Sequence, residues 1–204
     1  MRMISIALGC NGVLADFNAG VVRLIQDVTG KKFDAAAVID RDFTTGLGLS
    51  THEAEEVRVA LNARRGFATA LPRYPQARQG VRRLRTLGKV FCITTPYDSN
   101  VWWRDECESW LALHFGIDHV HHTDNNDKTP YKADVFVDDD AEHVHQWLTA
   151  WPGRTAVLWR NLYNKQQLVP QGAHAAESWE ALYQIAKEAA RSPLHQAQPA
   201  TDNP

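Results

Sequence analysis

Short apolar runs that alternate with helical patterns constrain the fold of this chain more than any other feature. The runs at residues 3–8, 89–94, 134–137 and 155–159 are rich in β-branched or aromatic side chains and bounded by Gly, Pro, Asp and Asn. Such runs are typical of buried strands, and residues 118–122 indicate a further short one. Helical periodicity occupies residues 17–29, 51–64, 76–87, 100–114, 141–150 and 178–190. The alternation predicts an α/β fold, a Rossmann-like parallel sheet with helices on both faces.

Small or polar residues stand where the first three of these main strands end. Gly9 and Asn11 follow the first strand, Thr94 ends the second, and Asp138 and Asp139 end the third. Sheets of this kind bind ligands at the carboxyl ends of their strands. The sequence therefore predicts one shared site at that edge.

The chain divides into three predicted parts. Residues 1–16 and 75–190 are expected to form the α/β core, and residues 17–74, which contain little strand pattern, a small helical cap inserted after the first strand. Within the cap, a short helix is expected to begin at Asp34. Residues 191–204 are rich in Pro, Gln and Ala and are expected to be a disordered tail.

Charge and cysteine usage exclude several classes of function. The formal net charge of −2 gives no electrostatic reason to expect nucleic acid or membrane binding. No apolar stretch approaches the roughly 20 residues that span a bilayer, and the N-terminus lacks the layout of a signal peptide. Cys10, Cys92 and Cys107 are widely spaced, which favours buried thiols in a reducing compartment. We therefore expect a cytoplasmic protein, and a homodimer is compatible with the sequence.

The first strand leads into the most diagnostic segment of the chain. From Ala7 to Phe17 it reads Ala-Leu-Gly-Cys-Asn-Gly-Val-Leu-Ala-Asp-Phe. This resembles the first motif of the haloacid dehalogenase superfamily, where the strand end reads Asp-x-Asp-Gly-x-Leu. Three further segments agree with that superfamily in order and spacing: a strand that ends in hydroxyls at Thr94 and Thr95, Lys128 after an aspartate, and an acidic pair at residues 138–139.

Additional features narrow the resemblance to the 5'(3')-deoxyribonucleotidase branch, over roughly residues 3 to 165. They are Gly66-Phe67, Leu71-Pro72, the helical pattern from Pro75 to Leu87, the Thr-Thr-Pro at 94–96, the stretch from Trp110 to Gly116, and the Asp-Lys-Thr at 127–129. The resemblance implies a magnesium-dependent phosphatase that acts on nucleoside monophosphates.

Both carboxylates that such enzymes use for chemistry are missing. The resemblance places Gly9 at the nucleophile and Asn11 at the general acid/base. Glycine cannot attack phosphorus, and asparagine cannot accept and return a proton at neutral pH. In the superfamily the nucleophile is also a ligand of Mg²⁺, so Asp138 and Asp139 are the metal ligands that remain. We expect Mg²⁺ binding to be weak.

The remaining parts of a phosphatase site are present. The resemblance gives a phosphate-binding cradle of five residues: Asn11, Gly12, Thr94, Thr95 and Lys128. Hydroxyls, an ammonium and turn amides suit a phosphate dianion. Phe17 and Phe67 are expected to line the substrate pocket, with an aromatic ring stacking on a nucleobase. Ala68 stands where the branch often has a second large residue.

Other groups are weaker candidates for chemistry. Cys10 points to the opposite strand face from positions 9 and 11 and is expected to be a structural thiol. Asp16 is expected to cap the next helix. His119, His121 and His122 lack partners at helical spacing, which disfavours a metal cluster.

Two functions from different classes are compatible with the pattern. The first is a catalytically inactive or impaired phosphatase that still binds a phosphorylated small molecule, such as a nucleoside monophosphate. The second is an active Mg²⁺-dependent phosphate monoester hydrolase with an altered mechanism, or a mutated form of one. We favour the first, because ester hydrolysis needs a barrier reduction well over ~10 kcal/mol and a cradle with poorly held metal supplies only part of it.

Overall fold

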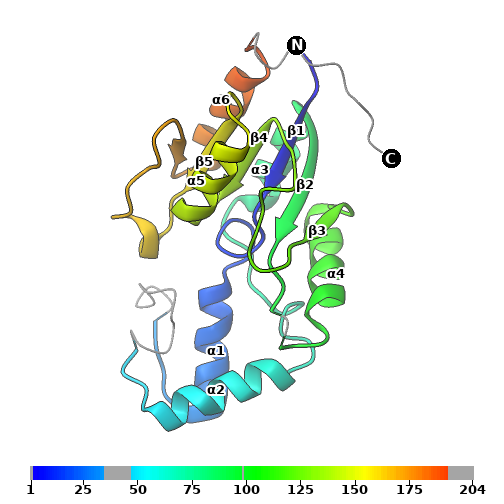
Figure 1. Ribbon diagram of the computed structural model, residues 1–204. Helices are drawn as coiled ribbons and strands as arrows, with labels where there is room; N and C mark the ends of the chain where they lie inside the picture. Colours follow the sequence, from blue (N-terminus) through cyan, green and yellow to red (C-terminus); the bar gives the residue numbers. More distant parts are fainter. Residues whose placement is uncertain (1, 35–46, 98, 193–204) are drawn as a thin grey trace.

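A six-stranded parallel sheet forms the centre of the computed structural model, which describes residues 2–34, 47–97 and 99–192 (Figure 1). The strand order is β3-β2-β1-β4-β5-β6, and every neighbouring pair is parallel. The strands are β1 (Ile4–Leu8), β2 (Gly88–Thr94), β3 (Val120–His122), β4 (Val135–Asp138), β5 (Thr155–Trp159) and β6 (His174–Ala176). The predicted α/β architecture is confirmed.

Alternation of side chains along the strands builds two apolar layers. On β1, Ile6 and Leu8 join the larger core, whereas Ala7 faces the smaller one. The larger core lies under α3 (Ala77–Leu84), α4 (Trp103–Phe115) and α6 (Trp179–Ala189), and the smaller one under α5 (Ala141–Ala150). Because both faces are covered, the central strands are apolar throughout rather than alternating with polar residues.

Of the three described helices between β1 and β2 in the sequence, the first two extend away from the sheet (Figure 1). They are α1 (Phe17–Thr29) and α2 (Thr51–Ala63), and they pack against each other. The Asp16 carboxylate accepts a hydrogen bond from the Ala19 amide at 2.9 Å, so Asp16 caps α1 as predicted. Ser50 and Glu53 form a reciprocal capping box that starts α2.

Several elements differ from the sequence prediction. Strand β6 and the short 3₁₀ helix η2 (Leu162–Asn164) were not predicted, because three-residue elements carry too little periodicity to detect. The helix predicted to begin at Asp34 and the tail predicted over residues 191–204 lie largely outside the described residues, which resume at residue 47 and end at residue 192. Among the described helices, none is both long enough and apolar enough to cross a bilayer.

Candidate functional site

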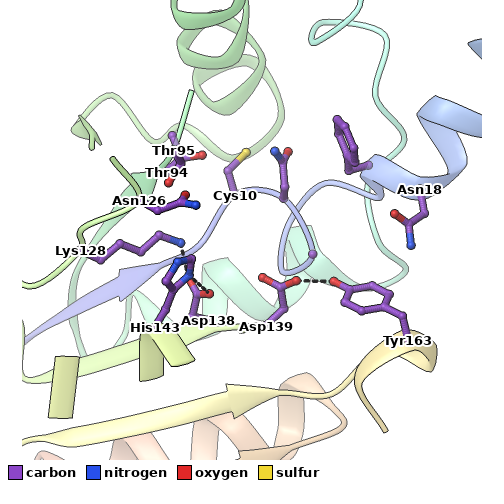
Figure 2. Close-up of a pocket in the computed structure, with 13 residues that line it drawn as sticks. Cys10, Asn18, Thr94, Thr95, Asn126, Lys128, Asp138, Asp139, His143 and Tyr163 are labelled. Atoms are coloured by element: carbon purple, nitrogen blue, oxygen red, sulfur yellow. Dashed lines mark hydrogen bonds and ion pairs between the residues drawn. The ribbon is translucent and has the colours of Figure 1, made fainter. Parts of the chain in front are cut away.

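The candidate site lies at the carboxyl edge of the sheet, where the strand order changes direction. From β1 the order runs one way to β2 and β3, and from β4 the other way to β5 and β6. In open α/β sheets the loops on the two sides of such a point diverge and leave a crevice. Here a pocket of about 240 Å³ occupies that position (Figure 2).

The loop after β1 forms one wall of the pocket. The Cys10 carbonyl accepts hydrogen bonds from the amides of Val13, Leu14 and Ala15, which folds the loop tightly back on itself. Gly12 has φ +77°, and a Cβ atom there would overlap the Asp139 carboxylate. Only glycine fits this position, both for its left-handed backbone and for its close approach to Asp139.

Several predicted phosphate contacts lie together, although some of their groups already have partners. Asn11, Gly12, Thr94, Thr95 and Lys128 all line the pocket. The Gly12 amide donates to the Ala15 carbonyl at 3.0 Å, so that N–H serves the loop itself. The Thr95 hydroxyl is 2.9 Å from the hydroxyl of Thr123.

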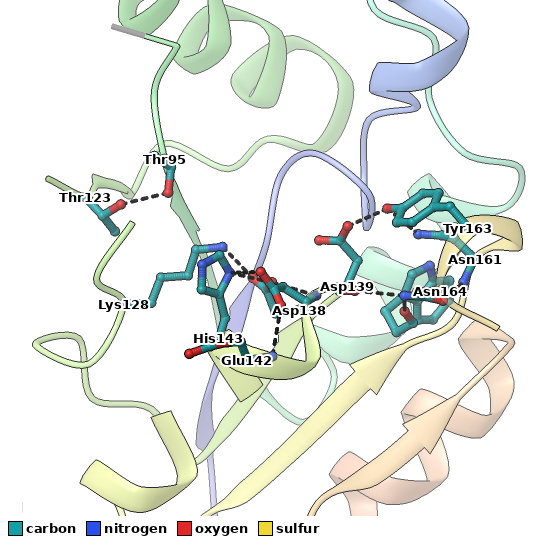
Figure 3. A network of polar contacts seen from close by, with 12 residues as sticks. Thr95, Thr123, Lys128, Asp138, Asp139, Glu142, His143, Asn161, Tyr163 and Asn164 are labelled. Carbon is teal, nitrogen blue, oxygen red and sulfur yellow. Dashed lines mark hydrogen bonds and ion pairs between the residues drawn. The ribbon is translucent and has the colours of Figure 1, made fainter. Parts of the chain in front are cut away.

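Asp138 is the buried electrostatic centre of the site (Figure 3). Its Oδ2 lies 2.5 Å from Nζ of Lys128, and its Oδ1 accepts from the Asp140 amide at 3.0 Å and lies 3.1 Å from Nδ1 of His143. Burial alone would raise the pKa of Asp138, but Lys128 and His143 hold it well below its ordinary value. Burial would likewise lower the pKa of Lys128, and the charge of Asp138 keeps it raised. The two residues therefore form a charged pair.

Asp139 is fixed by the segment that follows β5. The Tyr163 hydroxyl donates a short hydrogen bond to Oδ2 of Asp139, and Asn164 donates to the Asp139 carbonyl at 2.8 Å (Figure 3). Asn161 donates to the Gly12 carbonyl at 2.6 Å, which ties the same segment to the loop after β1. Burial, followed by the nearby Asp139 charge, raises the pKa of Tyr163, so the phenol remains a donor.

Gly9 lies beside Asp138 rather than in the pocket lining. Its amide donates to the Val137 carbonyl at 2.8 Å, and a Cβ atom added to it would be 3.0 Å from Oδ2 of Asp138. The Asp138 carboxylate thus occupies the space into which a side chain at position 9 would begin to extend.

The arrangement of donors does not fit a magnesium ion. Mg²⁺ requires near-octahedral oxygen ligands, usually carboxylates and water. Position 9 offers no side-chain oxygen, both oxygens of Asp138 already face protein donors, and Oδ2 of Asp139 accepts from Tyr163. Within the described residues, no group of three or more His, Cys, Asp or Glu side chains is arranged to hold a metal. Of the expected ligands, Asp138 thus has both carboxylate oxygens engaged by the protein, and Asp139 has its Oδ2 engaged.

The predicted pocket residues and thiols are placed as follows. Phe17 lines the pocket, whereas Phe67 is buried behind it, 6% exposed, and packs on Trp103. Cys10 reaches the pocket, but its Sγ lies 3.7 Å from Sγ of Cys107. Contact with Cys107 lowers the pKa of the Cys10 thiol, but Cys92 and burial outweigh it and raise that pKa well above its usual value. Cys10 is therefore a poor nucleophile.

Four lining residues were missed by sequence reasoning: Asn18, Asn126, His143 and Tyr163. A detectable signal existed only for His143, which is one turn into the helix after the acidic strand end. Asn126 belongs to a loop and has a left-handed backbone, φ 64°. Tyr163 belongs to η2, far along the chain from every motif.

The fold of this chain, a parallel sheet with helices on both faces, is that of haloacid dehalogenase-like hydrolases of known structure. A family profile gives the narrower assignment. The chain belongs to the family described as 5' nucleotidase, deoxy (pyrimidine), cytosolic type C protein, whose profile matches residues 2–192.

Solved structures share the fold at low sequence identity. A haloacid dehalogenase-like hydrolase from Streptococcus pneumoniae is 15% identical with a TM-score of 0.55, covering 90% of this chain and 98% of that chain. A Lactobacillus plantarum protein assigned as a phosphoglycolate phosphatase is 13% identical with a TM-score of 0.55, covering 91% and 100%. YfnB from Bacillus subtilis, assigned as a HAD-hydrolase and bound to magnesium, is 11% identical with a TM-score of 0.54, covering 91% and 99%. At 11–15% identity, these neighbours support the fold alone. A search of curated proteins gives no match.

Proposed function

We propose that this protein binds the phosphate group of a small phosphorylated compound and hydrolyses it slowly or not at all. The family description suggests a nucleotide as the first class of ligand to test. The observation that carries the proposal is the buried Lys128–Asp138 pair beside Thr94, in a pocket where positions 9 and 11 carry no carboxylate.

Without a bound metal, the charges in this pocket favour an anion more than those of a pocket with aspartates at positions 9 and 11 would. The resemblance gives four acidic positions: 9, 11, 138 and 139. Here two of these are neutral, and Asp138 faces the Lys128 ammonium at 2.5 Å. The Thr94 hydroxyl, on a side chain that is 2% exposed, adds a hydrogen-bond donor at the end of β2. Because positions 9 and 11 carry no carboxylate, no divalent ion is needed there to offset negative charge before phosphate makes a charge-assisted contact.

Catalysis lacks its reacting groups. Hydrolysis through a covalent intermediate requires a nucleophile and a proton carrier. Gly9 and Asn11 supply neither, and the Cys10 thiol is buried against Cys107. The remaining residues would still position a substrate and hydrogen-bond to it. They would not lower the activation free energy of hydrolysis by the amount that turnover needs.

Two measurements on one preparation test the proposal. Titration calorimetry with inorganic phosphate in EDTA should detect binding that Thr94→Val weakens and that Lys89→Ala leaves unchanged, since Lys89 is exposed near the opposite end of β2. A phosphatase assay with Mg²⁺ and a nucleoside monophosphate panel should show negligible turnover. Turnover that Asp139→Ala abolishes would instead establish the second function, an altered magnesium-dependent hydrolase.

A further inference from the structure

The pocket is small for a ligand that carries a nucleobase. Its volume is about 240 Å³, whereas sites for drug-sized ligands are about 300–1,000 Å³. Most side chains that line this one carry a hydrogen-bonding group, and Phe17 adds an apolar ring, so the lining surface is mixed. A compact ligand that carries both hydroxyl groups and carbon-bound hydrogens fits the volume and the lining.

The aromatic ring expected to stack on a base is used inside the protein. Phe67 lies 5.9 Å from Trp103 between ring centroids at an interplanar angle of 29°, and these residues are 6% and 1% exposed. Phe17 meets both rings edge-on, at 6.1 Å and 6.0 Å. Phe17, Phe67 and Trp103 thus form one cluster in which Phe67 has no open face for a base.

Three amides approach the pocket from separate segments. Asn11 belongs to the loop after β1, Asn18 to the start of α1, and Asn126 to the loop after β3, with Asn18 and Asn126 on different sides in Figure 2. Within the described structure, Oδ1 of Asn11 is buried and has no hydrogen-bond partner. Each amide can donate and accept, which is the pairing that hydroxyl groups require. An unpaired buried acceptor is costly unless a ligand or water donates to it.

From the small volume, the enclosed Phe67 ring and the three amides, we infer that the pocket takes a compact phosphorylated polyol, of the sugar phosphate class, in preference to a nucleoside monophosphate. The inference rests on the proposed function, because Lys128 and Thr94 must first receive the phosphate. The polyol hydroxyls then face Asn11, Asn18 and Asn126, and its carbon-bound hydrogens face Phe17.

Ribose 5-phosphate and uridine 5'-monophosphate test the inference, because they share the ribose phosphate and differ by the base. Calorimetry in EDTA should give ribose 5-phosphate at least about tenfold tighter binding than inorganic phosphate, as expected for one or two added hydrogen bonds. Uridine 5'-monophosphate should bind at least about tenfold more weakly than ribose 5-phosphate. Equal or tighter binding of the nucleotide would overturn the inference and leave the proposed phosphate binding intact.

A matched pair of variants assigns the contact. Asn126 and Asn125 both have left-handed backbones, at φ 64° and 55°, but Asn125 does not line this pocket. Asn126→Gly should weaken ribose 5-phosphate about threefold to tenfold and leave inorganic phosphate unchanged, whereas Asn125→Gly should change neither. Equal affinities in both variants and the unaltered protein would contradict the amide contact. Absence of binding by all three probes would overturn the proposed function as well.

Discussion

Nζ of Lys128 lies 2.5 Å from Oδ2 of Asp138, and the two residues are 7% and 0% exposed. A Cβ atom on Gly9 would be 3.0 Å from the same carboxylate oxygen. The Lys128 ammonium thus neutralises Asp138, which lies next to position 9, where the resemblance places another aspartate. This relationship links the stability of the protein to its metal and anion binding.

Lys128→Met should destabilise the protein by about 3–5 kcal/mol, because it leaves the buried Asp138 carboxylate without its ammonium. Adding Asp138→Asn to that variant should recover a large part of the loss, since no buried charge then remains. Urea denaturation of the single and double variants measures both effects. Equal stability of Lys128→Met and the unaltered protein would show that the pair is not buried in solution.

The cost of Lys128→Met should shrink as the pH falls. The folded-state pKa of Asp138 is depressed, so its contribution is present above the ordinary aspartate pKa of about 3.9 and is lost below it. In Lys128→Met the buried carboxyl keeps its contacts with His143 and the Asp140 amide but has lost its ammonium, and it can protonate and lose its charge. Denaturation curves from neutral to acidic pH should therefore converge, and a constant difference between the two proteins would contradict this account.

Gly9→Asp should make the protein less stable without metal and responsive to Mg²⁺. The Cβ atom of the new side chain would lie 3.0 Å from Oδ2 of Asp138, which brings a second carboxylate close to the first. Like charges at that range repel unless a cation lies between them. Mg²⁺ should raise the melting temperature of Gly9→Asp and leave that of the unaltered protein nearly unchanged. The double variant with Asn11→Asp should gain phosphatase activity, and Asn11→Asp alone should not.

Gly12→Ala should cost more stability than Gly30→Ala, although both glycines are left-handed, at φ 77° and 73°. Forcing alanine into that backbone costs about 1–2 kcal/mol, which is all that Gly30→Ala should lose because nothing lies within 4 Å of its new Cβ. Gly12→Ala also meets Asp139 and Tyr163, which should add about 1–3 kcal/mol of overpacking. Thermal denaturation of the two variants gives the difference directly.

Tyr163→Phe should lower the unfolding free energy by about 1.5–3 kcal/mol, since it removes a hydrogen bond to the charged Asp139. Tyr183→Phe, on α6 with its ring facing Arg83, is the matched control and should have little effect. The same Tyr163 variant should bind Mg²⁺ more readily than the unaltered protein, because one oxygen of Asp139 is released. Calorimetry with Mg²⁺ would show whether this competition exists.

The order of elements and the edge that carries the site were available from the sequence, and the reason is local. Burial on both faces makes the central strands apolar along their length, and a helix repeats every 3.6 residues, so both patterns are written in neighbouring residues. Thr94 and Asp138 end parallel strands of one sheet, so their meeting at one edge followed from topology alone. Asp16 was likewise predictable as a cap, because capping involves residues only three apart.

What only the tertiary structure decided is the set of partners that each group meets. Tyr163 reaches Asp139 from 24 residues away, and Asn161 reaches Gly12 from 149 residues away. The ring of Phe67 packs on Trp103. The carboxylate that accepts from Lys128 belongs to Asp138 and lies in the space beside Gly9. The sequence by itself determined the main strands, the edge of the sheet that carries the site, and the absence of a carboxylate at positions 9 and 11. The folded chain decided which charges are neutralised and which rings are enclosed, because these depend on contacts between residues that no sequence periodicity relates.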